Sequence, residues 1–450
     1  MFENITERQA REQILSIVAE YTDKFHKQKP YSPEQRIPYA SRVFDRSELT
    51  NLVDSALDFW LTAGKYTEQF EERFPKIINS KFCSLVNSGS SANLLAFMSL
   101  SSPLLEDRAI RPGDEVITVA AAFPTTVSPI IQYGAIPVFV DITIPQYNID
   151  VSRLESAYSP KTRAVILAHS LGNPFDLKMV KQFCDDRKLW LIEDNCDSLG
   201  ASYTMGGNEQ FTGTIGDMGT SSFYPAHHIT MGEGGAVYTD NPLLHKILRS
   251  MRDWGRDCVC PGGRDNMCGH RFEKQYGELP IGYDHKYVYS HFGYNLKVTD
   301  MQAAIGCAQL EKLPSFVERR RHNWQRLRDG LEGLEEKLIL PEPAPNSKPS
   351  WFGFMVTCNT REHTPEKRNK LTRFIEEKKV QTRTLFAGNI VKHPCFDQMR
   401  KNGTGYRIAG SLENTDRVLN NSFWVGVYPG MTDKMIDRMI EVIREGVKKF

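Results

Sequence analysis

Residues 189–200 read LWLIEDNCDSLG, and this stretch decides the fold class. It starts as an apolar run and reaches a carboxylate at Asp194. Apolar runs that lack polar alternation are typical of strands buried on both faces of a sheet. Open α/β sheets bind their ligands beyond the carboxyl ends of the strands, so Asp194 stands where a ligand is expected.

Six more runs of this kind occur between residues 82 and 240: FCSLVN, EVITVA, IPVFVD, RAVILAH, GTSSF and GAVYTD. Between several of them lie segments long enough for crossover helices, such as ANLLAFMSL and LKMVKQFCDDRK. Alternation of buried strands with helices predicts an α/β fold, in which a mostly parallel sheet carries helices on both faces.

The chain of 450 residues is too long for one compact core. We expect an N-terminal helical extension (1–48), a large domain (49–312) and a smaller α+β C-terminal domain (313–450). The long helical pattern that follows Pro314 would join the two domains.

The composition excludes several classes of protein. With 40% hydrophobic and 25% charged residues the chain is an ordinary globular one, and a net charge of +1 gives no sign of a nucleic-acid partner. No run of 18 apolar residues and no secretory signal is present, so we expect no membrane insertion and a cytoplasmic location. The nine cysteines would then be reduced or metal-bound.

The segment CSLVNSGSSANLL predicts a strand, a short Gly/Ser loop and a helix. The free N–H groups of the first helical turn, at Gly89, with the hydroxyls of Ser90 and Ser91, would bind a phosphate group. The alternative is a serine-capped helix without a ligand.

A ring-shaped ligand would complete such a phosphate site. Asp194 could pair with a protonated ring nitrogen, or it could be an ordinary helix cap. Phe123, in AAFPTTVSP, could lie flat on the ring, or it could be a core aromatic residue.

These motifs, read in order with the later ones, resemble a known family. NSGSSAN, GAIPVFVDI, LIEDNCDSLGA, SSFYPAHHITMGEGGAV and GYNLKVTDMQAAIG are similar to segments of the pyridoxal-phosphate sugar aminotransferases and dehydratases, the DegT/DnrJ/EryC1 family. The resemblance runs from about residue 52 to the C-terminus. It implies the aspartate aminotransferase fold, which is fold type I of the pyridoxal-phosphate enzymes.

The resemblance gives a role to the loop SSFYPAHHITMGEGG (221–235). Aminotransferases of the family carry there the lysine that forms an imine with the cofactor, and this chain has His227. An imidazole forms no stable imine but can accept and return a proton. The exchange is the mark of the sugar 3-dehydratases, which implies pyridoxamine phosphate as cofactor and His227 as the catalytic base. A buried structural histidine is the alternative, and the one we favour for His228.

Further residues follow from the same resemblance. Ser222 would help to bind the cofactor phosphate, and Asn295 would reach the phosphate of a neighbouring subunit, which implies a homodimer. Asp197 departs from the family, which usually has glutamine there, so the contact that the glutamine makes with the cofactor ring is in question.

Cysteines cluster in DWGRDCVCPGGRDNMCGHRF (253–272), where Cys258, Cys260 and Cys268 follow a Cys-x-Cys-x7-Cys pattern. Three thiolates call for a fourth ligand, for which Cys196 is the candidate. The thiolate count alone does not distinguish a zinc site from a [2Fe-2S] cluster. The spacing is not that of zinc ribbons, and deoxygenation at C3 of a sugar requires two electrons, so we favour the [2Fe-2S] cluster.

The cysteine pattern also resembles the iron-sulfur subset of the 3-dehydratases. It implies that CDP-4-keto-6-deoxy-D-glucose, a nucleotide sugar, is deoxygenated at C3 for the 3,6-dideoxyhexoses of lipopolysaccharide O-antigen. The chain has no nucleotide-binding glycine motif of its own, so a separate NADH-dependent flavin or iron-sulfur reductase would supply the electrons.

The sequence also offers candidates for contacts with the substrate. Tyr224, Arg383, Asn389 and Arg417 are candidates, although each could instead serve packing or an ion pair. Two other functions stay open: a cluster-free dehydratase coupled to transamination by glutamate, and a regulatory protein that lost catalysis with its lysine.

Overall fold

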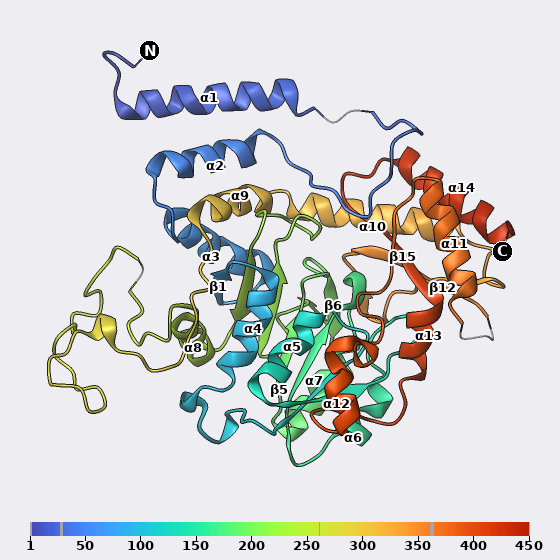
Figure 1. The fold of residues 1–450 in the computed structure, drawn as a ribbon. Helices are drawn as coiled ribbons and strands as arrows, with labels where there is room; N and C mark the ends of the chain where they lie inside the picture. Colours follow the sequence, from blue (N-terminus) through green and yellow to red (C-terminus); the bar gives the residue numbers. More distant parts are fainter. Residues whose placement is uncertain (1, 28–29, 261, 361–363, 450) are drawn as a thin grey trace.

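The computed structural model describes residues 2–27, 30–260, 262–360 and 364–449. Figure 1 shows a large α/β body in the centre and a smaller body with the C-terminus at the right. A long loop between α8 (Pro242–Arg252) and α9 (Asp300–Leu310) projects at the left. No helix within these ranges has the length and apolar character needed to cross a membrane.

The large body is built on an eight-stranded sheet. In spatial order its strands are β1 (Phe82–Val86), β9 (Gly235–Thr239), β8 (Met218–Ser222), β5 (Trp190–Asp194), β4 (Thr162–Ala168), β2 (Glu115–Val119), β3 (Ile136–Val140) and β14 (Arg407–Ile408). Only β9 runs antiparallel to its neighbours. All seven strands expected from the apolar runs are present, and the mostly parallel α/β sheet is confirmed.

The strands lack polar alternation because helices cover both faces of the sheet. Every residue of β2, β5, β8 and β9 is buried. One face packs against α4 (Gly89–Ser99), α5 (Pro124–Tyr133) and α8, and the other packs against α3 (Lys65–Ile78) and α9. Helix α7 (Leu177–Arg187) crosses between β4 and β5.

The small body is a four-stranded antiparallel sheet covered by helices. The sheet consists of β10 (Leu338–Ile339), β12 (Gly353–Cys358), β15 (Ser422–Gly426) and β13 (Thr382–Arg383). It packs against α10 (Leu313–Gly330), α11 (Glu366–Glu377) and α14 (Asp433–Lys449). The chain does not stay in this body, since β14 joins the large sheet beside β3.

The N-terminal segment also reaches the small body. Helix α1 (Glu7–Phe25) lies along α2 (Arg46–Asp58) at the top of Figure 1. Between the two helices, Ile37 pairs with Val380, and the backbone N–H of Tyr39 donates to the side chain of Gln381 at 3.0 Å. The segment around Tyr39 is thereby fixed beside the site described next, and the domain limits expected from the sequence stay a prediction.

Candidate active site

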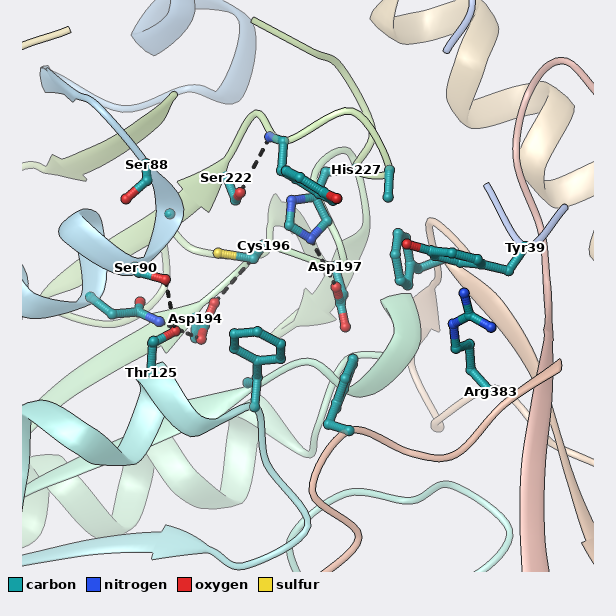
Figure 2. Close-up of a pocket in the computed structure, with 18 of the residues that line it drawn as sticks. Tyr39, Ser88, Ser90, Thr125, Asp194, Cys196, Asp197, Ser222, His227 and Arg383 are labelled. Atoms are coloured by element: carbon teal, nitrogen blue, oxygen red, sulfur yellow. Dashed lines mark hydrogen bonds and ion pairs between the residues drawn. The ribbon is translucent and has the colours of Figure 1, made fainter. Parts of the chain in front are cut away.

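A cavity of about 490 Å³ opens where the carboxyl ends of β1, β5 and β8 face the small body. Ser88 follows β1, whereas Asp194 and Ser222 are the last residues of β5 and β8. This is the sheet edge expected for a ligand, and the volume lies in the range of small-molecule sites. Figure 2 shows the side chains of these strand ends converging on the cavity.

A cradle for an anion forms at the start of α4. Ser88 caps the helix, accepting a hydrogen bond from the N–H of Ser91 at 3.1 Å. A Cβ atom on Gly89 would lie 2.3 Å from the Cβ of Ser222, so only glycine lets the helix start approach β8 this closely. Gly89 and Ser90 at the start of α4 line the cavity together with Ser222, and a helix start with nearby hydroxyls suits a phosphate group.

Asp194 is held in one orientation at the floor of the cavity. Its Oδ2 accepts hydrogen bonds from the Asn93 amide and the Thr126 hydroxyl, both at 2.7 Å, and its Oδ1 accepts from the N–H of Cys196 at 3.2 Å. A carboxylate has about four acceptor positions, so Oδ1 can still accept from a ligand in the cavity. Asp194 can therefore receive a hydrogen bond from a protonated ring nitrogen.

Phe123 forms part of the cavity wall. It precedes α5, is 50% exposed, and packs edge-to-face against Phe386 with ring centroids 5.9 Å apart. An aromatic face this open at the strand ends offers a surface for a planar ring.

His227 lies on a loop that is closed by its own hydrogen bonds. The N–H of Phe223 donates to the Gly234 carbonyl, and the N–H of Met231 donates to the Phe223 carbonyl, both at 2.8 Å. The imidazole packs against Phe352 with ring centroids 5.4 Å apart. Burial lowers the pKa of His227 to about 4; the Asp194 carboxylate acts against this shift and the Arg320 charge adds to it. The imidazole is therefore neutral near pH 7 and can accept a proton.

Asp197 stands beside this base. Its Oδ1 lies 3.6 Å from Nε2 of His227, as the dashed line in Figure 2 marks. Burial, and next the nearby Asp194 carboxylate, raise the pKa of Asp197 to about 8. Two adjacent groups whose pKa values are shifted apart are typical of acid-base sites.

His228 points away from the cavity. Its Nε2 donates to the carbonyl of Ser350 at 2.8 Å, and its side chain is buried. This contact ties the loop to the segment that leads into β12 and is structural.

The opposite wall of the cavity comes from the small body. Residues that line it there are Tyr39, Phe352, Arg383, Thr384, Phe386 and Trp424. The guanidinium of Arg383 lies 4.4 Å from the centre of the Tyr39 ring. Figure 2 shows the two side chains next to each other at the cavity. Among the described residues that line the cavity there is no lysine, and His227 occupies the place where the family's lysine was expected.

The cavity brings together most of the site residues expected from the sequence. Those that line it are Gly89, Ser90, Phe123, Asp194, Cys196, Ser222, Tyr224, His227 and Arg383. Ser91 is instead engaged in the cap of α4. Asn389 is buried and donates to Asp416 at 2.8 Å, while Arg417 and Asn295 do not line the cavity. The ligand contacts assigned to these residues stay predictions.

The cysteine loop does not form a metal site by itself. Cys258 and Cys260 are partly buried and Cys268 is exposed, with its Sγ 3.9 Å from Nδ1 of His285. Cys196 lies apart from them, in the wall of the cavity between Ser222 and Asp194 (Figure 2). Within the described ranges no three histidine, cysteine or acidic side chains are grouped so that they could hold a metal ion. The four cysteines are free thiols, so the donors have the right chemistry for a cluster but are not arranged around one.

The sequence reasoning missed the residues that small-body packing brings to the cavity. Tyr39, Phe352 and Trp424 belong to segments that carry no recognisable motif, and they meet only when the two bodies dock. No local signal could have identified them.

Comparison with known proteins agrees with this geometry. The chain is 50% identical over 442 residues to the lipopolysaccharide biosynthesis protein RfbH of Salmonella typhimurium, covering 98% of this chain and 99% of that protein. It is 47% identical to a dTDP-4-dehydro-2,6-dideoxy-D-glucose 3-dehydratase of Saccharopolyspora spinosa, covering 98% and 93% of the two chains.

Solved structures show the same fold. A GDP-4-keto-6-deoxymannose-3-dehydratase with bound GDP-perosamine superposes with a TM-score of 0.79 at 29% identity, over 90% of this chain and 99% of that one. The expected aminotransferase fold is confirmed. A family model matches residues 44–444, and the chain belongs to the DegT/DnrJ/EryC1/StrS aminotransferase family.

Proposed function

We propose that this protein is a pyridoxamine-phosphate-dependent 3-dehydratase of nucleotide-linked 4-keto-6-deoxyhexoses. The observation that carries the proposal is the neutral histidine that stands in place of a lysine at a cavity suited to the cofactor. Without an amine at this position the chain cannot hold the cofactor covalently, whereas His227 can still move protons.

The residues of the cavity fit pyridoxamine phosphate. The start of α4 with Ser90 and Ser222 would hold the phosphate, Phe123 would cover the ring, and Asp194 would accept a hydrogen bond from the ring nitrogen. When bound, the cofactor supplies an amine that joins the sugar ketone and withdraws electrons from it. His227 would then take a proton from the cofactor carbon that bears the amine and return it to the C3 hydroxyl of the sugar, which would leave as water.

We further propose that the physiological product is the 3-deoxy sugar and that the substrate is CDP-4-keto-6-deoxy-D-glucose. Replacing the C3 hydroxyl by hydrogen consumes two electrons and two protons, and a [2Fe-2S] cluster held by Cys196, Cys258, Cys260 and Cys268 would pass the electrons singly. A separate NADH-dependent reductase would provide them. The likeness to a lipopolysaccharide biosynthesis protein supports a role in forming dideoxyhexoses for the O-antigen.

A homodimer is part of the same proposal. The loop between α8 and α9 exposes large apolar side chains, including Phe292, Ile281 and Tyr289. Contact with a second copy would cover this surface and bring Asn295 near the partner's cofactor site.

One experiment tests the reaction and its substrate together. Protein loaded with pyridoxamine phosphate is incubated anaerobically with the CDP, dTDP or GDP form of the 4-keto-6-deoxy sugar, and mass spectrometry follows the loss of the C3 oxygen, which leaves as water. We expect dehydration with a preference for the CDP sugar. No loss of water from any of the three sugars would refute the proposal.

A second candidate is the cluster-free dehydratase coupled to transamination. It is favoured by the solved GDP-4-keto-6-deoxymannose-3-dehydratase with a trapped PLP-glutamate geminal diamine, which is 29% identical to this chain. Glutamate-dependent formation of 2-oxoglutarate by protein that binds no iron or sulfide would support this candidate. Stoichiometric iron and sulfide, with glutamate inert, would support the reductive enzyme.

A further inference from the structure

Beneath the loop of His227, α10 places one fully buried arginine. The side chain of Arg320 is 1% exposed. Its Nη2 donates to the carbonyl of His227 at 3.0 Å. Its Nη1 donates to the carbonyls of Trp351 at 3.0 Å and Val427 at 2.6 Å. One guanidinium thus joins the loop of the base to two segments of the small body.

The charge of Arg320 has no bonded counter-ion. In the described part of the chain no carboxylate lies within ion-pair distance of it, and its Nε has no hydrogen-bond partner. Burial lowers the pKa of Arg320 to about 9, and the Asp197 charge acts against this shift. A buried cation that is bonded to carbonyls alone is costly, and such costs are typical of functional sites.

The three carbonyls lie beside residues that shape the cavity. Trp351 precedes Phe352, whose ring packs against the imidazole, and Val427 follows β15 directly after Gly426. The guanidinium therefore fixes the position of His227 relative to the small-body wall of the cavity.

The ionisable groups that face His227 come from several elements. They are Asp194 and Asp197 at the end of β5, Tyr224 and His228 on its own loop, Arg320 on α10, and Tyr39 and Arg383 across the cavity. Asp194 favours the protonated imidazole, and Arg320 opposes it.

We propose that Arg320 is a positioning residue for His227. Arg320 holds the backbone of His227 in place relative to the small body, and its unpaired charge disfavours a second positive charge on the imidazole. The inference rests on the proposed role of His227 as the base. It concerns the site before any substrate binds, so it can be tested without turnover.

The test compares two neighbouring arginines on α10. Arg320→Gln removes the charge but keeps hydrogen-bond donors. Arg321→Gln is the matched control, because Arg321 also donates to carbonyls, those of Pro349, Lys348 and Gly200, but not to the His227 loop. Each protein carries histidine labelled with carbon-13 at Cε1, and the His227 signal is the one missing from His227→Asn. Its pH titration is followed by NMR in the absence of substrate.

We expect the midpoint of His227 to rise in Arg320→Gln by about one pH unit, a tenfold change in the ratio of protonated to neutral imidazole. Arg321→Gln should leave the midpoint at the wild-type value. An unchanged midpoint in folded Arg320→Gln would overturn the inference, whereas failure of the proposed reaction would leave this titration as it is.

Arg320→Lys gives a second test, should the glutamine variant not fold. Lysine keeps its positive charge at the acidic pH values of the titration. Its ammonium group lacks the planar guanidinium of arginine, so it cannot donate to all three carbonyls. We expect the His227 midpoint to stay near the wild-type value. With the nucleotide sugar present, solvent exchange of the cofactor hydrogen that His227 removes should slow at least about tenfold. Exchange at the wild-type rate would refute the positioning role.

Discussion

Two loops of this molecule carry the residues on which the proposed chemistry depends, and they are built in opposite ways. The loop of His227, between β8 and β9, is closed by backbone hydrogen bonds and packed between α10 and the small body. The cysteine loop, between α8 and α9, projects from the large body (Figure 1). Of the described residues from 256 to 292, only Val288 is buried.

The difference shows which part of the site the chain can form alone. The position of His227 follows from packing within one subunit, so the base is in place before any ligand binds. The cysteines have the chemistry to bind a cluster but little packing to place them, and their arrangement would have to come from the metal or from another chain. The four predictions below test this contrast.

Loss of the base should have the largest effect. General-base catalysis contributes about 10²- to 10⁴-fold, so His227→Asn should slow by that factor the solvent exchange of the cofactor hydrogen that His227 removes when the nucleotide sugar is present. Because the pKa of His227 lies at about 4, wild-type exchange should be constant from pH 8 to about pH 5 and fall as the imidazole is protonated below that. Equal exchange rates in wild type and His227→Asn would show that His227 is not the base. The control is a fluorescence titration of cofactor binding, in which the affinity should be unchanged.

The second-largest effect is expected in the rates at which limited proteolysis cuts the two loops. Exposed loops open locally at almost no free-energy cost, whereas packed segments open only with the global unfolding of the protein. We expect chymotrypsin to cut after Phe272 or Tyr276, in the cysteine loop, at least about a hundredfold faster than after Phe223, in the loop of His227. Mass spectrometry of the fragments measures this. Anaerobic addition of iron and sulfide should protect the loop, and equal cutting of the two loops in the untreated protein would contradict the contrast.

The sequence predicted most of the large sheet, and for a physical reason. Strands buried on both faces must be apolar throughout, so runs such as LWLIED can be identified without an alignment. Strand ends in a parallel sheet meet at one edge, which is why Asp194 was expected at a ligand site, whereas Ser222 was expected there only from the family resemblance. The hairpin of β6 (Ser202–Met205) and β7 (Asn208–Phe211) was not expected, because its short polar strands carry no such pattern.

Contacts that depend on docking could not be predicted. Tyr39 reaches the cavity because the segment before α2 follows the edge of the small sheet, and Arg320 reaches His227 because α10 passes under the loop. Neither contact leaves a local signal in the sequence. The cysteine pattern was visible, but spacing alone does not say how Cys196 and Cys268 could meet.

Added volume should distinguish the packed phosphate cradle, which lies against the strand that leads into the loop of His227, from the cysteine loop. In Gly89→Ala the new Cβ would lie 2.3 Å from the Cβ of Ser222, so α4 and β8 must separate where the phosphate is expected. Overpacking of this kind costs about 1–3 kcal/mol, and we expect cofactor affinity to fall about ten- to a hundredfold. Gly262→Ala in the cysteine loop is the control, since its nearest neighbour would be 3.8 Å away. Fluorescence titration with pyridoxamine phosphate measures both variants, and equal affinities would show that the cradle tolerates a side chain.

The smallest expected effect concerns the cysteines themselves. In iron-free protein Cys260→Ser should change the free energy of unfolding by no more than about 0.5 kcal/mol, because the thiol has little packing to lose. Cys83→Ser is the matched control: Cys83, on β1, is 3% exposed in the core, and a buried hydroxyl without a partner should cost about 1–3 kcal/mol. Urea denaturation followed by circular dichroism compares the two variants. A large loss of unfolding free energy in Cys260→Ser would mean that the cysteine loop is packed even without metal. The two loops would then not differ in packing, which would contradict the comparison.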